Sequence, residues 1–311
     1  MTHTKFLYLF TQVCILLPSK LVVWIYVHTT GKKHKTTPDY RKSVLRLTLG
    51  YSPCPNDTFM FYALASGSLS LPGCTFDVQI YDVETLNRMA LQQKLDITKL
   101  SFYAWLNVKN RYRLLENGAA LGYGCGPVVI SKEALKVSDI PSCRVVLPGE
   151  WTTAHLLFQL WAPGAKNKIF MSYDRIFDLL TEGSADCGVI IHESRFTFKQ
   201  AGFQAIMDLG AWWEDETGLP VPLGCIAANN RISDALVNPL DTLIAQSITY
   251  AHAHTKEALS YIREYAQEME EDILKKHIRT FVNRFSLGLG ETGRAAVAKL
   301  EQMARQAGII T

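Results

Sequence analysis

His192 is the residue of this sequence best suited to proton transfer. It follows the apolar run of residues 188–191, which is typical of a buried strand, and it opens a polar stretch that continues with Glu193. A neutral imidazole at the mouth of a sheet is a suitable general base near neutral pH, and neighbouring helix N-termini would lower its pKa. The other interpretation is a partly exposed histidine with one structural hydrogen bond, and the residues alone leave both open.

The turn at residues 52–59 is a second candidate site. Two prolines stiffen it, and Asn56 or Asp57 is predicted to cap the helix that follows. The N–H groups at such a helix start carry a partial positive charge and can bind an anion. Asn56 and Thr58 are therefore candidate substrate-binding residues, although an ordinary turn uses the same residue types.

Polar residues also follow two other predicted strands, where side chains of a parallel sheet face the crevice. Lys99 lies at the end of the strand 95–100 and is followed by Ser101. Its ammonium could meet a substrate carboxylate, or it could be an exposed cap. Thr152 and Thr153 precede a predicted helix, so they offer hydroxyls and N–H groups to a second anionic or hydroxylated part of a ligand.

Other common site chemistries lack support in the sequence. The 7 cysteines are scattered and never spaced Cys-x-x-Cys, which favours reduced thiols in a cytoplasmic protein over disulfides or zinc. His252 and His254 are two residues apart on a predicted helix, where side chains diverge, so no metal site is expected. The Gly-rich passage 122–127 leads into a strand, unlike a phosphate loop, and no G-x-S-x-G elbow is present. A net charge of +3 argues against nucleic acid as a partner.

The order of the predicted elements indicates an α/β protein with two lobes. The chain has 311 residues, enough for two packed cores. From residue 45 onward strands alternate with helices, which predicts parallel strands joined by right-handed crossovers, and the second half repeats this pattern. We predict that one lobe comprises residues 44–127 and 224–311, that the other comprises 128–223, and that the ligand binds between them.

Residues 1–43 fit this organisation poorly. Two apolar runs, 6–18 and 21–27, are separated by Lys20, which would cost about 2.5–3.5 kcal/mol at the centre of a spanning helix. A secretory signal would need a small-residue cleavage site, which this stretch lacks. We expect the segment to be an extraneous or disordered leader, with Val44 as the residue of a non-standard start codon. A membrane anchor is the alternative, so a membrane is a partner only if the leader is real.

Five motifs together resemble the 1,4-dihydroxy-6-naphthoate synthases, which open cyclic dehypoxanthine futalosine on the futalosine route to menaquinone. The likeness covers the chain from about residue 45 to its end, and the first and last motifs are specific to that family. The motifs are Gly50-Tyr51-Ser52-Pro53-Cys54-Pro55-Asn56-Asp57-Thr58-Phe59, Asp96-Ile97-Thr98-Lys99-Leu100-Ser101, Gly124-Cys125-Gly126-Pro127, Pro148-Gly149 with Thr152-Thr153-Ala154, and Ile191-His192-Glu193-Ser194-Arg195-Phe196.

The resemblance implies a type II periplasmic-binding-protein-like fold that serves as a carbon–carbon lyase without a cofactor, with cyclic dehypoxanthine futalosine as its small-molecule substrate. It assigns the family's proton acceptor to His192. It assigns substrate contacts to the stretch Lys99, Leu100 and Ser101, and to the Thr-Thr-Ala segment, where Thr153 and Ala154 are the expected contacts.

Two other functions are compatible with the same fold. A solute-binding protein of a transport system needs no base in its cleft but needs a cleavable signal. A chorismate dehydratase belongs to the same pathway, but the motifs at residues 52–58 and 191–193 argue against it. The sequence leaves open whether the protein is a monomer or a homodimer, the pKa of His192, and whether Trp212 and Trp213 stack on the substrate or pack a lobe.

Overall fold

The computed structural model describes residues 9–16, 22–29, 44–266 and 270–311, and the chain divides into two units, 1–43 and 44–311. In the first unit, strands β1 (Leu9–Leu16) and β2 (Val22–Thr29) pair in antiparallel fashion. The two apolar runs of the predicted leader are therefore extended where they are described, and the rest of that leader lies outside the described residues. Among the described residues, no helix is long and apolar enough to cross a membrane.

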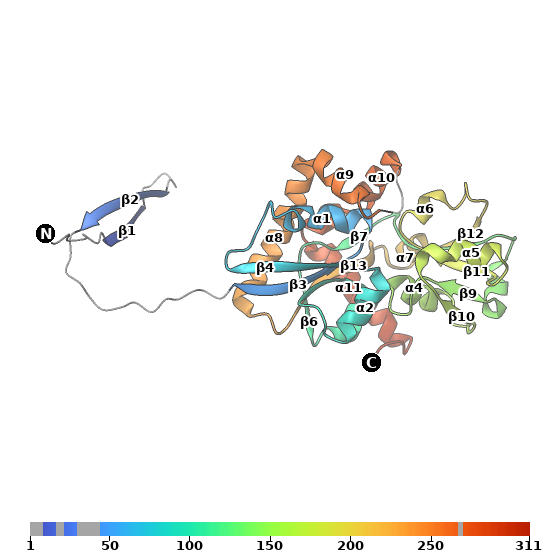
Figure 1. Ribbon diagram of the computed structural model, residues 1–311. Helices are drawn as coiled ribbons and strands as arrows, with labels where there is room; N and C mark the ends of the chain where they lie inside the picture. The colour runs from blue at the N-terminus through green and yellow to red at the C-terminus, as the bar shows by residue number, and fades with distance from the viewer. Residues whose placement is uncertain (1–8, 17–21, 30–43, 267–269) are drawn as a thin grey trace. The chain divides into compact units, whose positions relative to one another are not determined.

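A six-stranded sheet organises what we call lobe 1 of the second unit (Figure 1). Its first three strands are parallel, as the alternation of strands and helices predicts, and β13 runs antiparallel to β5. The sheet order is β4-β3-β5-β13-β6, with β7 also paired to β13. The strands are β3 (Leu45–Tyr51), β4 (Cys74–Ile80), β5 (Ile97–Ser101), β6 (Tyr112–Leu114), β7 (Ala120–Gly122) and β13 (Val221–Asn229).

A five-stranded sheet organises lobe 2 in a similar way. Strand β9 is parallel to both β10 and β11, whereas β8 runs antiparallel to β11 and β12. The order is β10-β9-β11-β8-β12. The strands are β8 (Val128–Ser131), β9 (Val145–Leu147), β10 (Lys168–Phe170), β11 (Cys187–Ile190) and β12 (Gln204–Asp208).

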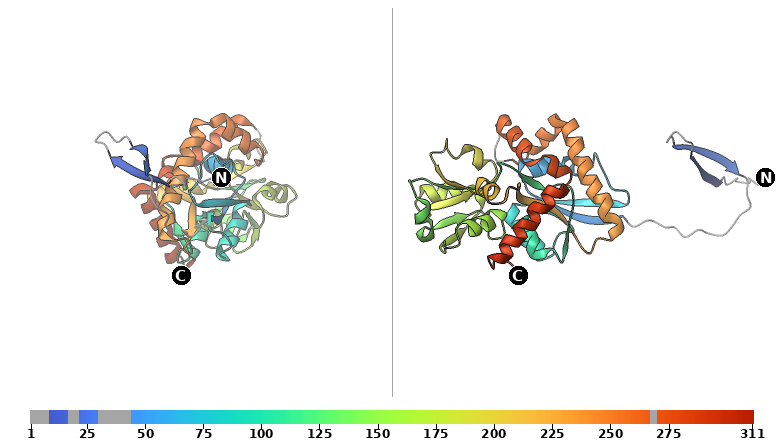
Figure 2. Two further views of the ribbon diagram at one scale, coloured as in Figure 1. Left: turned by 60° about the vertical axis from the view of Figure 1, so that its left-hand side comes forward. Right: turned by 180° about the vertical axis from the view of Figure 1, so that it is seen from behind.

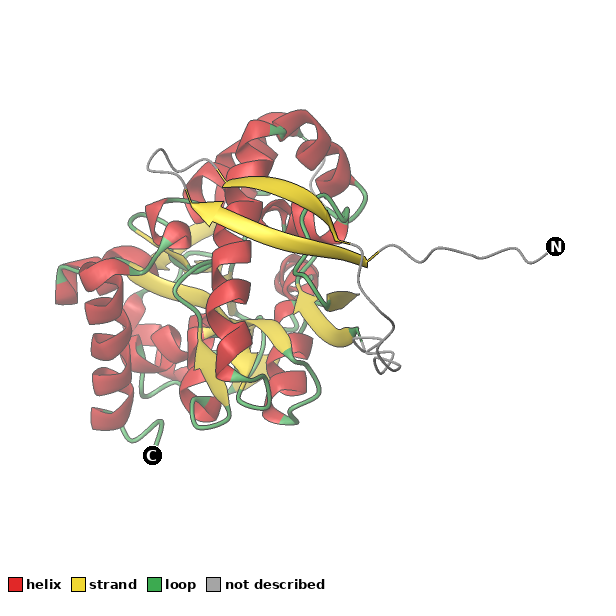
Figure 3. Cartoon of the chain, turned by 90° about the vertical axis from the view of Figure 1, so that its left-hand side faces the viewer, coloured by secondary structure: helices red, strands yellow, loops and turns green. Residues whose placement is uncertain are grey.

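Helices flank the sheets of both lobes. Figure 3 shows the helices in red and the strands in yellow, and the right-hand view of Figure 2 shows helix α11 from behind. Short 3₁₀ turns span Val137–Ser142, Tyr173–Arg175 and Arg284–Leu287. The helices of lobe 1 are α1 (Pro55–Ala65), α2 (Val83–Leu91), α3 (Phe102–Val108), α8 (Asp234–Ala253), α9 (Thr255–Arg263), α10 (Glu271–Phe281) and α11 (Gly290–Gln306). Those of lobe 2 are α4 (Thr153–Trp161), α5 (Ile176–Thr181), α6 (Ser194–Thr197) and α7 (Leu209–Thr217).

The hydrophobic core is continuous between the lobes rather than split into two. One cluster of buried side chains joins α3, β13 and α11 of lobe 1 to β9, α4 and α7 of lobe 2. Smaller clusters lie under α1 and α8 in lobe 1, and between β8 and α5 in lobe 2. The chain crosses between the lobes at Gly126, where a Cβ atom would lie 2.2 Å from the Cα of Gly210. Only glycine permits this approach of two backbones.

Candidate active site

A cavity lies where the two lobes meet, and eight of the nine site residues predicted from the sequence line it. It encloses about 640 Å³, open solvent included. Its wall also contains Ser52, Asp57 and Phe281 from lobe 1 and Ile191 from lobe 2. The predicted residues brought together here are His192, Asn56, Lys99, Leu100, Ser101, Thr152, Thr153 and Ala154.

His192 follows the last residue of β11, and lobe 1 contacts its ring. Its backbone has φ of +56°, a left-handed conformation that is uncommon for a non-glycine residue and that recurs at functional sites. Nε2 lies 3.5 Å from Sγ of Cys54, and the edge-on ring of Tyr173 lies 4.9 Å away between centroids. The ring of His277 lies nearly parallel at 6.2 Å. The contacts with Cys54, Tyr173 and His277 therefore restrict the position of the imidazole in the cavity wall.

The imidazole of His192 is neutral at neutral pH. Its pKa is lowered to about 4, mainly because burial penalises the charged form. The carboxylate of Asp57 acts in the opposite direction, and the ammonium of Lys99 adds to the lowering. The sequence analysis expected a lowered pKa, and this is confirmed, but the principal cause is burial rather than nearby helix N-termini.

The anion at the start of α1 is the protein's own Asp57. Its carboxylate accepts hydrogen bonds from the Ser52 hydroxyl at 2.6 Å, the Asn56 amide at 2.7 Å and the Lys99 ammonium at 2.5 Å. The expectation that Asn56 or Asp57 caps this helix is wrong, because Cys54 is the N-cap and both residues lie in the first turn. Lys99 thus lines the cavity while its charge is paired internally.

Ser101 keeps a hydroxyl proton for a ligand. Its backbone N–H donates to Oδ1 of Asn87, and its Oγ accepts from Nδ2 of the same amide. No acceptor for the Ser101 hydroxyl proton is found in the described part of the chain. Asn87 also donates to the carbonyl of Trp151 in lobe 2, so one buried amide orients Ser101 and joins the two lobes.

The start of α4 offers backbone N–H groups rather than hydroxyls. Thr152 is the N-cap, and its Oγ accepts from the N–H of His155 and donates to the Gly149 carbonyl. Thr153 donates its hydroxyl to the Leu223 carbonyl at 2.7 Å. Both hydroxyls are therefore engaged, whereas the N–H groups of Thr153 and Ala154 have no partner in the described residues. These two donors at a helix start suit an anionic group.

One predicted contact, Thr58, does not line the cavity, and neither do the two tryptophans whose role the sequence left open. Thr58 is fully buried, and its hydroxyl donates back to the Cys54 carbonyl at 2.9 Å. Trp213 is also fully buried and donates to the Pro220 carbonyl, while Trp212 packs against the central core cluster. Neither tryptophan lines the cavity, so packing is the role that the structure gives them.

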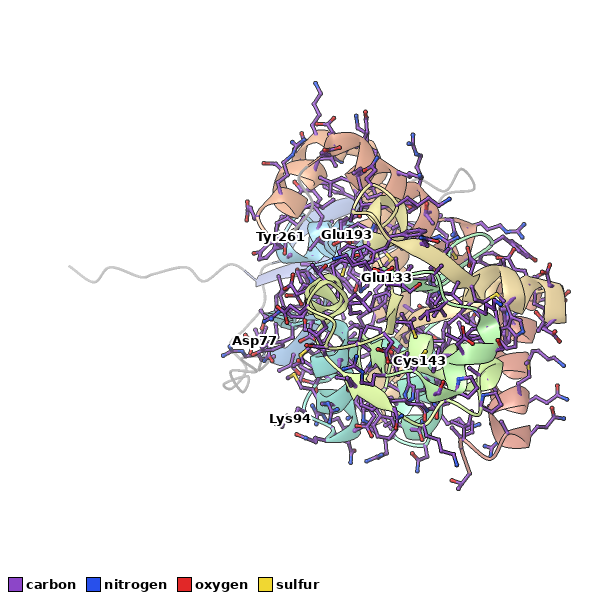
Figure 4. All side chains as sticks on the ribbon, turned by 90° about the vertical axis from the view of Figure 1, so that its right-hand side faces the viewer. Asp77, Lys94, Glu133, Cys143, Glu193 and Tyr261 are labelled. Carbon is purple, nitrogen blue, oxygen red and sulfur yellow. The ribbon has the colours of Figure 1, made fainter. Side chains whose placement is uncertain are left out.

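The sequence analysis missed His277, which lies on α10 behind the cavity wall. It is fully buried, and its Nε2–H donates to Oδ1 of Asn56 at 2.9 Å. Its Nδ1 lies 3.7 Å from a carboxylate oxygen of Glu193, the neighbour of His192 labelled in Figure 4. Burial lowers its pKa well below the usual value. Periodicity identifies a buried position on α10, but only the fold brings that position beside His192.

Comparison with known proteins identifies the family of this chain. A family model described as menaquinone biosynthesis matches residues 47–306. The chain belongs to this family. Two relatives bear the name 1,4-dihydroxy-6-naphthoate synthase. The protein of Thermus thermophilus is 45% identical over 85% of this chain and 95% of its own length. The protein of Streptomyces coelicolor is 38% identical over 85% and 94%. The resemblance inferred from the five motifs is thus confirmed.

Solved structures support the predicted fold. A protein from Archaeoglobus fulgidus superposes with a TM-score of 0.81 at 30% identity, covering 87% of this chain and 100% of that one. A ligand-binding component of an ABC-type import system from Staphylococcus aureus superposes with a TM-score of 0.62 at 10% identity, covering 86% and 93%. The likeness to the second protein concerns the fold alone. This member of the menaquinone-biosynthesis family therefore has a two-lobed, periplasmic-binding-protein-like fold, as predicted.

Buried neutral histidines should make this family member sensitive to mild acid. The pKa of His155 is also lowered to about 4 by burial, and its ring donates to the Glu150 carbonyl and accepts from Lys168. In the unfolded chain these imidazoles bind a proton below about pH 6.5, whereas in the folded protein they do so only below about pH 4. Their contribution to the free energy of unfolding is therefore fully present above pH 6.5. Between pH 6.5 and pH 4, we expect each such histidine to lower the free energy of unfolding by up to about 1.4 kcal/mol per pH unit.

Urea unfolding at pH 7, 6 and 5 measures this effect. The variant His155→Gln should show a shallower loss than the parent protein over that range, because one fewer group gains a proton on unfolding. The variant His252→Gln, at an exposed position on α8, is the matched control for the substitution itself. Equal slopes for the parent protein and His155→Gln would contradict the assignment of a buried neutral imidazole at position 155.

Proposed function

We propose that this protein converts cyclic dehypoxanthine futalosine to 1,4-dihydroxy-6-naphthoate, acting as a carbon–carbon lyase with His192 as general base. The observation that carries the proposal is a neutral imidazole on the wall of an inter-lobe cavity that is also lined by the start of α4, where two N–H donors have no partner among the described residues. The motifs shared with the naphthoate synthases and the names of the two relatives support the same reaction.

In the proposed reaction, His192 removes a proton from the sugar-derived part of the substrate. The electron pair of that C–H bond forms a new double bond within the sugar-derived fragment, the carbon–carbon bond between the fragment and the ring system breaks, and the electrons of that bond pass into the ring system, which becomes the aromatic naphthoate. Aromatisation supplies much of the driving force. A base with a pKa below the working pH is already deprotonated when the substrate arrives, so no prior proton loss is needed.

The rest of the cavity is proposed to hold and orient the substrate. The N–H groups of Thr153 and Ala154 would bind the carboxylate of the aromatic part, because a helix start favours negative charge. The hydroxyl of Ser101 would donate to an oxygen of the ligand. Apolar side chains such as Leu100 and Phe281 offer a surface to the ring system.

The compartment proposed for this reaction is the cytoplasm. The cysteines whose side chains are described, from Cys54 to Cys225, are all free thiols, and all of these except Cys74 are buried. Reduced thiols in this number are typical of a reducing compartment.

Incubation of the purified protein with cyclic dehypoxanthine futalosine tests the proposal. We expect time-dependent formation of 1,4-dihydroxy-6-naphthoate, detected by mass spectrometry, with His192→Asn as the inactive control. Binding without product would instead indicate a solute-binding protein. Turnover of chorismate in place of the futalosine derivative would indicate a chorismate dehydratase. Either of these two results would overturn the proposed reaction.

A further inference from the structure

The two nitrogens of the His192 ring have different surroundings. Nε2 lies 3.5 Å from Sγ of Cys54. The hydrogen bond found for this ring among the described residues is that of Nε2, so Nδ1 is left for a ligand of the cavity that His192 lines. A neutral imidazole carries one N–H and one lone pair, so the tautomer decides which nitrogen can accept a proton. Within the described part of the chain, the contact with Cys54 is the polar contact of this ring that can select between the tautomers.

The backbone on both sides fixes where the Cys54 thiol lies. Prolines precede and follow Cys54, and its carbonyl accepts from the N–H groups of Asp57 and Thr58 and from the Thr58 hydroxyl. Its own N–H faces the Ser52 hydroxyl at 3.4 Å. The side chain is 3% exposed, and burial with the nearby carboxylates of Glu193 and Asp57 raises its pKa well above the usual value. The thiol therefore stays protonated, so its uncharged sulfur can accept a hydrogen bond.

We propose that Cys54 is a positioning residue that selects the reactive tautomer of His192: the Nε2–H donates to Sγ, and the lone pair is left on Nδ1. The reverse arrangement, with S–H donating to Nε2, would place the ring proton on Nδ1 and leave no open nitrogen to act as base. The catalytic meaning of this contact rests on the proposed function, but the tautomer itself is a property of the resting protein.

The same contact bridges the two lobes. Cys54 belongs to lobe 1 and His192 to lobe 2, so a group of one lobe holds the base that the other lobe carries. The rings of Tyr173 and His277 flank the imidazole and restrict its rotation, but the contacts described for them are ring contacts that do not distinguish its two nitrogens. Cys54 is therefore the group whose removal should change the tautomer while leaving the ring in place.

Nitrogen NMR of the full chain labelled with ¹⁵N-histidine, at neutral pH without substrate, tests the tautomer directly. The signals of His192 are those absent from the variant His192→Asn. We expect Nε2 to appear as the protonated nitrogen in the parent protein and in Cys54→Ser, whose hydroxyl keeps a hydrogen-bonding partner. In Cys54→Ala we expect a mixture of both tautomers. Cys187→Ala, a buried thiol on β11 that does not line the cavity, should behave as the parent does.

Kinetics with cyclic dehypoxanthine futalosine form the second measurement. Cys54→Ala should lower kcat by about tenfold or more with little change in KM, and Cys54→Ser should recover part of that loss. Protonation of Nδ1 in the resting parent protein, or an unchanged tautomer in a folded Cys54→Ala, would overturn the inference. If the parent protein itself fails to turn over this substrate, the proposed function falls while the NMR result still decides the role of Cys54.

Discussion

Replacing His192 by Asn should reduce turnover of cyclic dehypoxanthine futalosine by about a hundredfold to ten-thousandfold, the range that a general base contributes. Asparagine is uncharged and of similar size, and the parent imidazole is itself neutral because its pKa is lowered to about 4. The substitution therefore removes the base without adding or removing a charge at neutral pH. Binding of the substrate, measured by calorimetry, should be largely retained, since the proposed anchoring groups lie on α4 and β5.

His252→Asn is the matched control for this prediction. His252 is exposed on α8 and does not line the cavity, so its replacement should leave turnover and binding at parent values. Thermal unfolding of both variants separates loss of chemistry from loss of fold. Near-normal turnover by a folded His192→Asn protein would remove His192 from the role of base, whatever the substrate.

The strands and helices of both lobes could be predicted because each depends on local sequence. Alternating apolar residues mark β3 and β4, and the repeated order of strand and helix indicates parallel pairing. The rule that ligands bind near the carboxyl ends of parallel strands pointed to Lys99 and His192 separately, because they belong to the sheets of different lobes. Both residues line the cavity between those lobes.

The partners of these residues could not be predicted, because they depend on contacts between distant parts of the chain. Asp57 looked like a helix cap, yet its carboxylate meets Lys99, which is 42 positions further on. Cys54 looked like one of several scattered thiols, and only the fold shows that it lies beside His192. No local pattern could indicate that Thr58 turns its hydroxyl back to its own loop instead of toward a ligand.

Removing one partner of the ion pair between Lys99 and Asp57 should cost far more stability than removing one partner of an exposed pair. The two side chains are 5% and 3% exposed and lie 2.5 Å apart. Removing one partner of a buried pair leaves the other charge without compensation, which typically costs about 3–5 kcal/mol. We therefore expect Lys99→Met to lower the free energy of unfolding in urea by about that amount. A Cβ atom at position 224 would lie 3.1 Å from Cε of Lys99, so the lysine stem packs against Gly224, and methionine is chosen because its side chain is no longer than that of lysine.

Lys109→Met is the matched control, because Lys109 pairs with Glu301 at 2.6 Å but is 38% exposed. An exposed pair is worth at most about 1 kcal/mol, so the same substitution there should have a small effect. The double variant Lys99→Met with Asp57→Asn should be more stable than the sum of the single losses predicts, since it leaves no uncompensated charge. A small loss of stability together with a raised KM would instead indicate that Lys99 binds the substrate. If Lys99→Met loses less than about 1 kcal/mol but greatly raises KM, the ammonium serves the substrate carboxylate rather than Asp57, and the sequence-based role of Lys99 would replace the structural one.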